Sequence, residues 1–286
     1  MRALVLSGGG PLAVAWESGL LAGLAEAGVA AADADFILGT SAGAIVGAQL
    51  TTDRTPDALL TAILEEEKGV PPPGARLYDP AAVASLPALF AKALGPGDRA
   101  AARAEVGAKA LAMQAPPEAE EVAQMKLMVG GADWSDRGFG CVAVDIGDGA
   151  VRILTRDCGA SLAHAVAASC SLPGLSQPIT IGGRRYMDGG FNSVANADLL
   201  SGYDQMLVLC FRPAGLPGDR MAARLDEQVA HLRTAGTTVE VIFPDAATQA
   251  AIGANIMDVR LRPAAARTGR AQGRALADSI RRFLTV

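Results

Sequence analysis

The chain reads Leu38-Gly39-Thr40-Ser41-Ala42-Gly43-Ala44 where an apolar run ends and an alanine-rich segment begins. A Gly-x-Ser-x-Gly turn between a strand and a helix raises its serine on a tight elbow, with a helix N-terminus behind it. A side chain at Gly39 or Gly43 would crowd this elbow or block an approaching substrate. The stretch therefore predicts that Ser41 is a nucleophile.

Short apolar segments alternate with helix-compatible ones on both sides of this turn. Residues 2–6 and 36–38 are typical of buried strands, and residues 14–27 and 42–49 are typical of helices. Such alternation predicts a parallel sheet covered by helices on both faces. Further elements are expected as strands at 139–146, 151–155, 206–211 and 239–243, a hairpin of 179–181 and 184–187 around Gly182-Gly183, and helices at 161–169 and 263–284.

Residues 55–138 break this alternation, because they contain no convincing strand. Helix-like segments cover residues 56–68, 80–94, 99–113 and 118–129. The segments are separated by Pro71-Pro72-Pro73-Gly74, Gly95-Pro96-Gly97 and Pro116-Pro117. We interpret the pattern as a helical insertion that forms a lid. Ordinary helices of the outer layer would fit the same pattern equally well.

Composition narrows the class of protein. The 286 residues are 50% hydrophobic, enough for one large α/β core. The net charge of −5 argues against nucleic-acid binding and against electrostatic capture by anionic membranes. Apolar runs end well short of the roughly 20 residues of a transmembrane helix. Residues 2–6 already form a core strand, so we expect no cleaved secretory signal and a cytoplasmic location.

A serine nucleophile needs a neighbouring base, and the chain has only two histidines. His164 lies in a helix-like segment and is expected to be structural. His231 follows Asp188, so the order Ser, Asp, His of the α/β-hydrolases is formally satisfied. In those enzymes, however, the elbow usually follows several strands, whereas Ser41 follows the second. His231 is therefore the weaker alternative.

Asp188 is the stronger candidate for the base. It lies in Tyr186-Met187-Asp188-Gly189-Gly190, where a strand ends and two glycines leave room for a substrate. Taken alone, this stretch also fits an ordinary Asp-Gly turn. An aspartate is a weak base in water, but an apolar pocket would raise its pKa and its proton affinity. Together with the early serine elbow, it predicts a Ser–Asp dyad.

The stretch Ser7-Gly8-Gly9-Gly10-Pro11 follows the first strand. Consecutive glycines can turn their backbone N–H groups toward a ligand, and such groups stabilise the oxyanion of acyl transfer. Pro11 has no N–H and cannot contribute. The predicted oxyanion hole consists of Gly8, Gly9, Gly10 and Ala42.

The same loop also fits a dinucleotide-binding fingerprint, with Asp33 and Asp35 about 20 residues further on. Both aspartates precede the second strand instead of ending it, and a nucleotide site would leave Ser41 and Asp188 unexplained. No metal-ligand pattern is recognisable, so no cofactor or metal is expected. The four cysteines lack CxxC spacing, and Cys141, Cys170 and Cys210 are expected as reduced core thiols.

With these elements in this order, the chain resembles the patatin-like phospholipase family. The matching stretches are Gly8-Gly9-Gly10, Gly39-Thr40-Ser41-Ala42-Gly43 and Asp188-Gly189-Gly190. Between the last two, Ala168-Ser169-Cys170-Ser171-Leu172-Pro173-Gly174-Leu175 is similar to the family's small-residue segment that shapes the pocket wall. The resemblance covers about residues 2–212.

The resemblance implies a three-layer α/β/α sandwich with a mainly parallel sheet, as one domain over residues 1–286. The insertion at about 55–138 and the terminal helix at about 263–284 belong to it. It further implies a lipid esterase, phospholipase A or lysophospholipase that forms an acyl-serine at Ser41, with Asp188 as base and no metal. The expected partner is an acyl-ester substrate and not nucleic acid, while peripheral membrane contact and the oligomeric state stay open.

Two departures from the family pattern bear on the substrate. Family members often carry Arg or Lys and then Gly after the triple glycine, where this chain has Leu12 and Ala13. The loss of a cation that could meet a phosphate favours a neutral ester over a phospholipid. The family's Asn-x-Pro after the aspartate is replaced by Asn192 and Asn196-Ala197.

A catalytically weak regulatory or lipid-binding protein with this fold is the alternative function.

Overall fold

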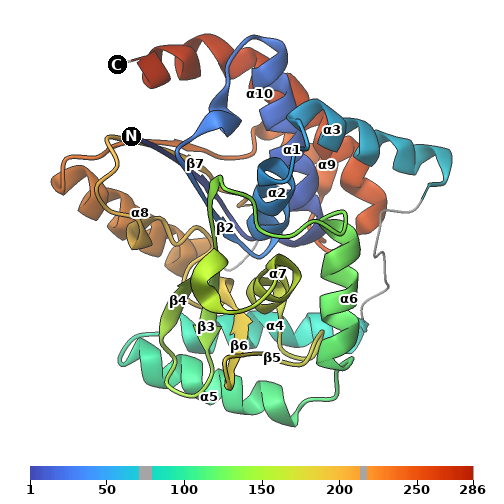
Figure 1. Cartoon of the computed structure of the whole chain (residues 1–286), viewed down its shortest axis with the longest axis vertical. Coiled ribbons are helices and arrows are strands. Elements are labelled where there is room, and N and C mark those ends of the chain that lie inside the picture. The colour runs from blue at the N-terminus through green and yellow to red at the C-terminus, as the bar shows by residue number, and fades with distance from the viewer. Residues whose placement is uncertain (71–78, 213–217, 286) are drawn as a thin grey trace.

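The computed structural model describes residues 1–70, 79–212 and 218–285 (Figure 1). The strands are β1 Arg2–Leu6, β2 Phe36–Thr40, β3 Gly138–Asp145, β4 Val151–Leu154, β5 Ile179–Ile181, β6 Arg184–Asp188, β7 Gln205–Leu209 and β8 Thr238–Ile242. The helices are α1 Gly10–Glu26, α2 Ala42–Thr51, α3 Pro56–Glu65, α4 Pro80–Ala93, α5 Arg99–Ala112, α6 Glu118–Met128, α7 Leu162–Cys170, α8 Gly218–Thr234, α9 Ala246–Ile252 and α10 Arg262–Thr285. The predicted break at Pro71-Pro72-Pro73-Gly74 lies outside the described residues.

Eight strands of the described residues form one sheet. Five of them, in the order β3-β2-β1-β7-β8, run parallel. β4 and β6 pair antiparallel with β3, and β5 and β6 form the hairpin predicted at Gly182-Gly183. The expectation of a mainly parallel sheet is therefore confirmed, with the antiparallel strands gathered around β3.

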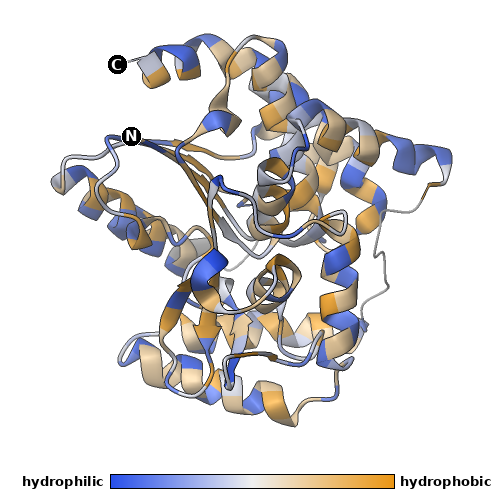
Figure 2. Ribbon diagram, in the orientation of Figure 1, coloured by the Kyte–Doolittle hydropathy of each residue, from blue (hydrophilic) through white to orange (hydrophobic). Residues whose placement is uncertain are grey.

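Helices cover both faces of the sheet, which confirms the α/β/α architecture (Figure 1). Leu4 and Leu6 of β1 pack in one core with α1, α2, α7 and α10. Ala3 and Val5 point to the opposite face and pack against α8. Successive residues of a strand point to opposite faces, so an unbroken apolar strand serves both cores. Figure 2 shows these strands as hydrophobic and the outer helical surfaces as mixed with hydrophilic residues.

Three helices differ from the sequence prediction. α1 begins at Gly10, four residues before the predicted start at 14. Pro11 does not prevent this, because N–H groups of a first helical turn have no intrahelical acceptor. α8 and α9 were not predicted, although Leu225, Val229 and Leu232 of α8 form a buried stripe at helical spacing.

The longest helix, α10, packs backbone to backbone against α1. A Cβ atom at Gly19 of α1 would lie 2.1 Å from the carbonyl oxygen of Ala266, and one at Gly273 of α10 would lie 2.2 Å from that of Leu20. Glycines on both helices therefore allow an approach that a larger residue would prevent. On the outer side, Arg270 of α10 pairs with Glu26 of α1.

The segment between α2 and β3 is helical wherever the structure describes it as a regular element. Leu59 and Leu60 of α3 pack in the main core with α1, whereas α4 and α5 pack around β3 and β6 through Ala93 and Val106. That part of this segment forms a lid stays a prediction. Among the described residues, no helix is both long enough and apolar enough to span a bilayer.

The contact between α1 and α10 predicts a large cost for Gly19→Leu. The new side chain would meet the backbone of α10, and overpacking of this kind lowers the free energy of unfolding by about 1–3 kcal/mol or more. Ala25→Leu is the control, because Ala25 is exposed on the same helix and the change should cost less than about 0.5 kcal/mol. Urea denaturation measures both, and equal midpoints for the two variants would contradict the packing.

Candidate active site

The carboxyl ends of β2 and β6 meet along one edge of β3. Thr40, the last residue of β2, pairs with Val142, and Asp188, the last residue of β6, pairs with the next residue, Ala143. β4 occupies the opposite edge of β3 across the same positions, so β2 and β6 lie end to end. Ser41 and Asp188 are therefore neighbours in space although they are far apart in the sequence.

Ser41 stands on a strained elbow. Its φ of 52° and ψ of −113° lie in a region that residues other than glycine rarely adopt. Its N–H donates to Ser169 Oγ at 2.9 Å, and the Ser169 hydroxyl donates to the Val142 carbonyl at 2.6 Å. The Cys170 thiol donates to the Ser41 carbonyl at 3.3 Å. The end of α7, in the segment matched to a pocket wall, thus holds the serine in place.

The close packing of the elbow requires both of its glycines. A Cβ atom at Gly43 would lie 2.1 Å from the carbonyl oxygen of Leu6, and one at Gly39 would lie 2.5 Å from the Cα of Ala44. Both contacts are with backbone atoms, which cannot move aside as a flexible side chain would. The Gly43 N–H also donates to the Ser7 carbonyl at 3.0 Å, which ties the elbow to the glycine-rich loop.

Asp188 is a buried carboxyl with an unusually high pKa. Its side chain accepts a hydrogen bond from the Gly190 N–H at 2.7 Å through Oδ1. Burial raises its pKa to about 7, while the Ser41 hydroxyl and the Gly190 N–H lower it and the charge of Glu121 raises it. The Ser41 hydroxyl is close enough to influence this pKa, yet Oδ2 makes no hydrogen bond of regular geometry to any described residue. One buried oxygen of the carboxyl is thus left without a regular hydrogen bond, close to the serine.

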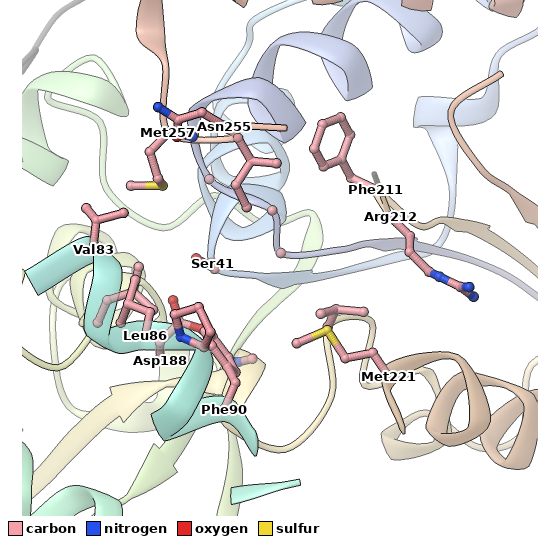
Figure 3. Close-up of a pocket in the computed structure, with 18 of the residues that line it drawn as sticks. Ser41, Val83, Leu86, Phe90, Asp188, Phe211, Arg212, Met221, Asn255 and Met257 are labelled. Carbon is pink, nitrogen blue, oxygen red and sulfur yellow. Dashed lines mark hydrogen bonds between the residues drawn. The ribbon is translucent and has the colours of Figure 1, made fainter. Parts of the chain in front are cut away.

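One cavity of about 220 Å³ contains both side chains. Figure 3 shows Ser41 and Asp188 facing the same space, with Val83, Leu86 and Phe90 of α4 along one side. The glycine-rich loop forms another part of the lining, together with Leu172, Phe211, Met221 and Met257. The walls are therefore largely apolar, and α4 from the predicted insertion supplies much of one wall.

Two helices begin at this cavity. Gly9 and Gly10 stand at the N-terminus of α1, and Ala42 is the first residue of α2. Among the described residues, the N–H groups of these three have no hydrogen-bond acceptor, as expected at helix N-termini. Gly8 is a correction to the predicted set, because its N–H donates to the Val194 carbonyl at 2.8 Å. Gly8 therefore lines the cavity without a free donor.

The alternative catalytic groups lie elsewhere. His164 Nδ1 hydrogen-bonds Ser161 Oγ at 2.8 Å on α7, and His231 is exposed on α8. Neither histidine is among the described residues that line the cavity. Asp35 accepts a hydrogen bond from the Arg2 N–H at 2.6 Å, at the amino ends of β1 and β2. The glycine-rich loop lies at the opposite, carboxyl end of β1. Asp35 therefore cannot contact a nucleotide bound at that loop.

The cysteines and acidic residues form no metal centre in the part of the chain that the structure describes. All four cysteines are free. Burial raises the pKa of the Cys141 and Cys170 thiols well above their ordinary value, and it raises that of Cys210 to about 12. These thiols are therefore protonated at neutral pH and poorly reactive.

Sequence reasoning missed Glu17, which supports the glycine-rich loop. This fully buried carboxyl accepts a hydrogen bond from the Ser7 N–H at 2.9 Å. Desolvation raises its pKa well above the ordinary value, which favours the protonated, uncharged form of the carboxyl. The Ser7 hydroxyl in turn accepts from the Phe211 N–H at 2.7 Å. The available signal was a lone carboxylate in the otherwise apolar first half of α1.

The comparison with known protein families agrees with the earlier resemblance. A family model described as patatin-like phospholipase matches residues 4–201. The structure of VipD from Legionella pneumophila is 15% identical with a TM-score of 0.46, and the match covers 97% of this chain and 67% of that one.

The type III effector ExoU is 19% identical with a TM-score of 0.43, and the match covers 97% of this chain and 53% of that one. The ExoU–SpcU complex from Pseudomonas aeruginosa is 15% identical with a TM-score of 0.42, covering 100% and 52%. This chain thus spans about half the length of ExoU. No curated protein sequence matches it.

The buried carboxyl predicts that Asp188→Asn stabilises the protein at alkaline pH. The folded chain holds the proton up to about pH 7, whereas the ordinary pKa of the group is 3.8, so the wild type loses stability as pH rises between the two. The variant lacks this loss, and its amide oxygen would keep the acceptor for the Gly190 N–H.

We expect Asp188→Asn to be more stable than wild type at pH 8, by at most about 4 kcal/mol. The difference should disappear near pH 4. Urea denaturation at both pH values measures the difference in stability between the two proteins. Both proteins contain Glu17, so its contribution drops out of that difference. A variant that is equally stable or less stable at pH 8 would show that Asp188 is not desolvated.

Proposed function

Since this chain belongs to the patatin-like phospholipase family, we propose that it is a serine acyl hydrolase with Ser41 and Asp188 as its catalytic dyad. One observation carries the proposal. A serine on a strained elbow and a buried carboxyl of raised pKa face each other in one apolar cavity, where no histidine of the described residues reaches them. Perturbed carboxyls in a cleft beside a nucleophile are typical of active sites.

Each group has a role in acyl transfer. The Ser41 hydroxyl attacks the ester carbonyl while Asp188 takes its proton, and a pKa near 7 suits a general base at neutral pH. The N–H groups of Gly9, Gly10 and Ala42 stabilise the oxyanion. Asp188 returns the proton to the leaving alcohol, which leaves an acyl-serine. Water activated by Asp188 then releases the carboxylic acid and restores Ser41.

The cavity favours a neutral acyl ester. Its apolar wall suits an acyl chain, and buried Leu12 stands where family members often carry a cation. Arg212 is the one cationic side chain among the described lining residues, and it points away from Ser41 (Figure 3). A phosphate next to the reacting carbonyl would therefore meet no nearby positive charge from these residues.

The dyad predicts a distinct pattern of activity on p-nitrophenyl butyrate. Ser41→Ala and Asp188→Asn should each lower kcat by about 10³-fold or more, because each removes a group that acts as a unit with the other. Asp188 must be ionised to act as a base, so wild-type kcat/KM should fall as pH drops through about 7. A pH series of initial rates measures this.

His231→Ala is the matched control and should keep wild-type activity. Loss of activity in this variant would support a triad instead of the dyad. A fluorophosphonate probe should label the wild type but not Ser41→Ala. A folded wild type that is neither labelled nor active would favour the lipid-binding alternative.

We also propose that α4, which belongs to the predicted insertion at about 55–138, forms a wall of the groove that binds the acyl chain. Leu86 is buried against the cavity, whereas Ala88 on the same helix is exposed. Leu86→Trp should therefore lower kcat/KM for decanoate esters about tenfold while acetate esters are hydrolysed nearly as before. Ala88→Trp is the control. Equal losses on both esters would exclude this role for α4.

A further inference from the structure

Arg103 of α5 is a buried cation with carbonyl partners. Its side chain belongs to a residue that is only 7% exposed, and Nε donates to the Gly149 carbonyl at 2.7 Å. Nη1 donates to Asn192 Oδ1 at 3.0 Å. No carboxylate of the described residues pairs with it, and burial lowers its pKa from the ordinary value. Burying an arginine without an ionic partner costs free energy of hydration, which its hydrogen bonds must offset.

The hydrogen bonds continue from Asn192 into the site. Asn192 Nδ2 donates to Asn196 Oδ1 at 2.7 Å, and both asparagines are buried. Asn196 Nδ2 lies within hydrogen-bond distance of Thr40 Oγ1 and of the Gly189 carbonyl, at 3.1 Å each. Asn196 adopts a left-handed φ of 56°, which asparagine tolerates better than most residues. One amide group therefore bridges the segment before the serine and the segment after the aspartate.

Arg103 and the backbone carbonyls that accept from Asn196 fix the direction of this relay from its two ends. A guanidinium can only donate hydrogen bonds, so Asn192 must present its oxygen to Arg103 and its nitrogen to Asn196. Asn196 must then present its oxygen to Asn192 and its nitrogen to Thr40 and Gly189. At the other end, Asn196 Nδ2 also donates to the Ser193 carbonyl at 2.6 Å, and the two backbone carbonyls keep this amide from turning over. Without a donor at position 103, the Asn192 oxygen would lose its partner, and the bridge would be held from one end only.

We propose that Arg103 is a positioning residue that sets the spacing of Ser41 and Asp188 through Asn192 and Asn196. The proposal rests on the function proposed above. Thr40 directly precedes Ser41, and Gly189 directly follows Asp188, so the relay ends beside both reacting groups. Misplacement of reacting groups by about 1 Å can lower a rate about 100-fold. The relay therefore acts on kcat through geometry.

The first test compares Arg103→Met with wild type on p-nitrophenyl butyrate. We expect kcat to fall about 10- to 100-fold, with KM and the pH midpoint near 7 unchanged, because Arg103 is not among the charges that shift the pKa of Asp188. Arg103→Lys should recover part of kcat, since an ammonium still donates. Arg99→Met is the control, because Arg99 is half-exposed on the same helix and lies 3.6 Å from Glu227. An unchanged kcat in Arg103→Met would overturn the proposal.

Asn192→Asp tests the relay without removing the buried cation. A carboxylate at this position would keep an acceptor for Arg103 but lose the donor to Asn196. We expect the same loss of kcat, and the Arg103→Met/Asn192→Asp double variant should lose no more than Arg103→Met alone. Unchanged kcat in Asn192→Asp, or losses that multiply in the double variant, would contradict the relay. This variant keeps the test usable should Arg103→Met fail to fold.

Hydrogen exchange separates this proposal from the proposed function. In the Asn192→Asp variant, peptides covering residues 38–45 and 188–197 should exchange faster than in wild type, while the rest of the chain is unchanged. This readout does not depend on catalysis. An inactive wild type would refute the hydrolase but leave this local effect in place. Uniform or absent acceleration would refute the relay even in an active enzyme.

Discussion

The site depends on how two strands, β2 and β6, share one edge of β3. β3 is longer than β2, and the residues by which it extends past Thr40 pair with the end of β6. Two strands that arrive from opposite directions therefore finish at adjacent positions, Val142 and Ala143 of β3. A shift of β6 by one residue would turn Asp188 to the other face of the sheet, because side chains alternate along a strand. This register places the carboxyl beside Ser41.

The conformation of Ser41 and the burial of Asp188 both lower the stability of the folded protein. Ser41 is held at a positive φ, and Asp188 is desolvated with one oxygen that lacks a regular hydrogen bond. Such features persist only where the surrounding structure overdetermines them. Here the end of α7 clamps the serine backbone, and the glycine contact between α1 and α10 stabilises the helical layer behind the loop. Burial thus raises the pKa of the carboxyl at a cost in stability.

The two helices that start at the cavity give it its polarity. α1 and α2 bring free N–H groups to an otherwise apolar space, and helix N-termini favour developing negative charge. Buried Glu17 accepts a hydrogen bond from Ser7 at the start of the glycine-rich loop between β1 and α1, and the first glycine of the loop, Gly8, donates to the Val194 carbonyl. These hydrogen bonds preorganise the loop, which is what the oxyanion role proposed for it would need.

The sequence alone determined the local chemistry. The Gly-x-Ser-x-Gly turn, the Asp-Gly-Gly turn, the hairpin at Gly182-Gly183 and most helix boundaries follow from backbone sterics and caps that act over a few residues. Those signals sufficed for the layered fold and for Ser41 and Asp188 as candidates. They missed α8, whose few apolar residues leave a weak pattern, and they placed the start of α1 too late.

Only the tertiary structure decided how these local pieces meet. The end-to-end register of β2 and β6, the occupied N–H of Gly8 and the relay from Arg103 all join residues far apart in the chain. The raised pKa of Asp188 likewise comes from desolvation by surrounding elements. Short-range propensities carry no information on strand register or on which polar groups lose water, because both depend on packing between distant segments.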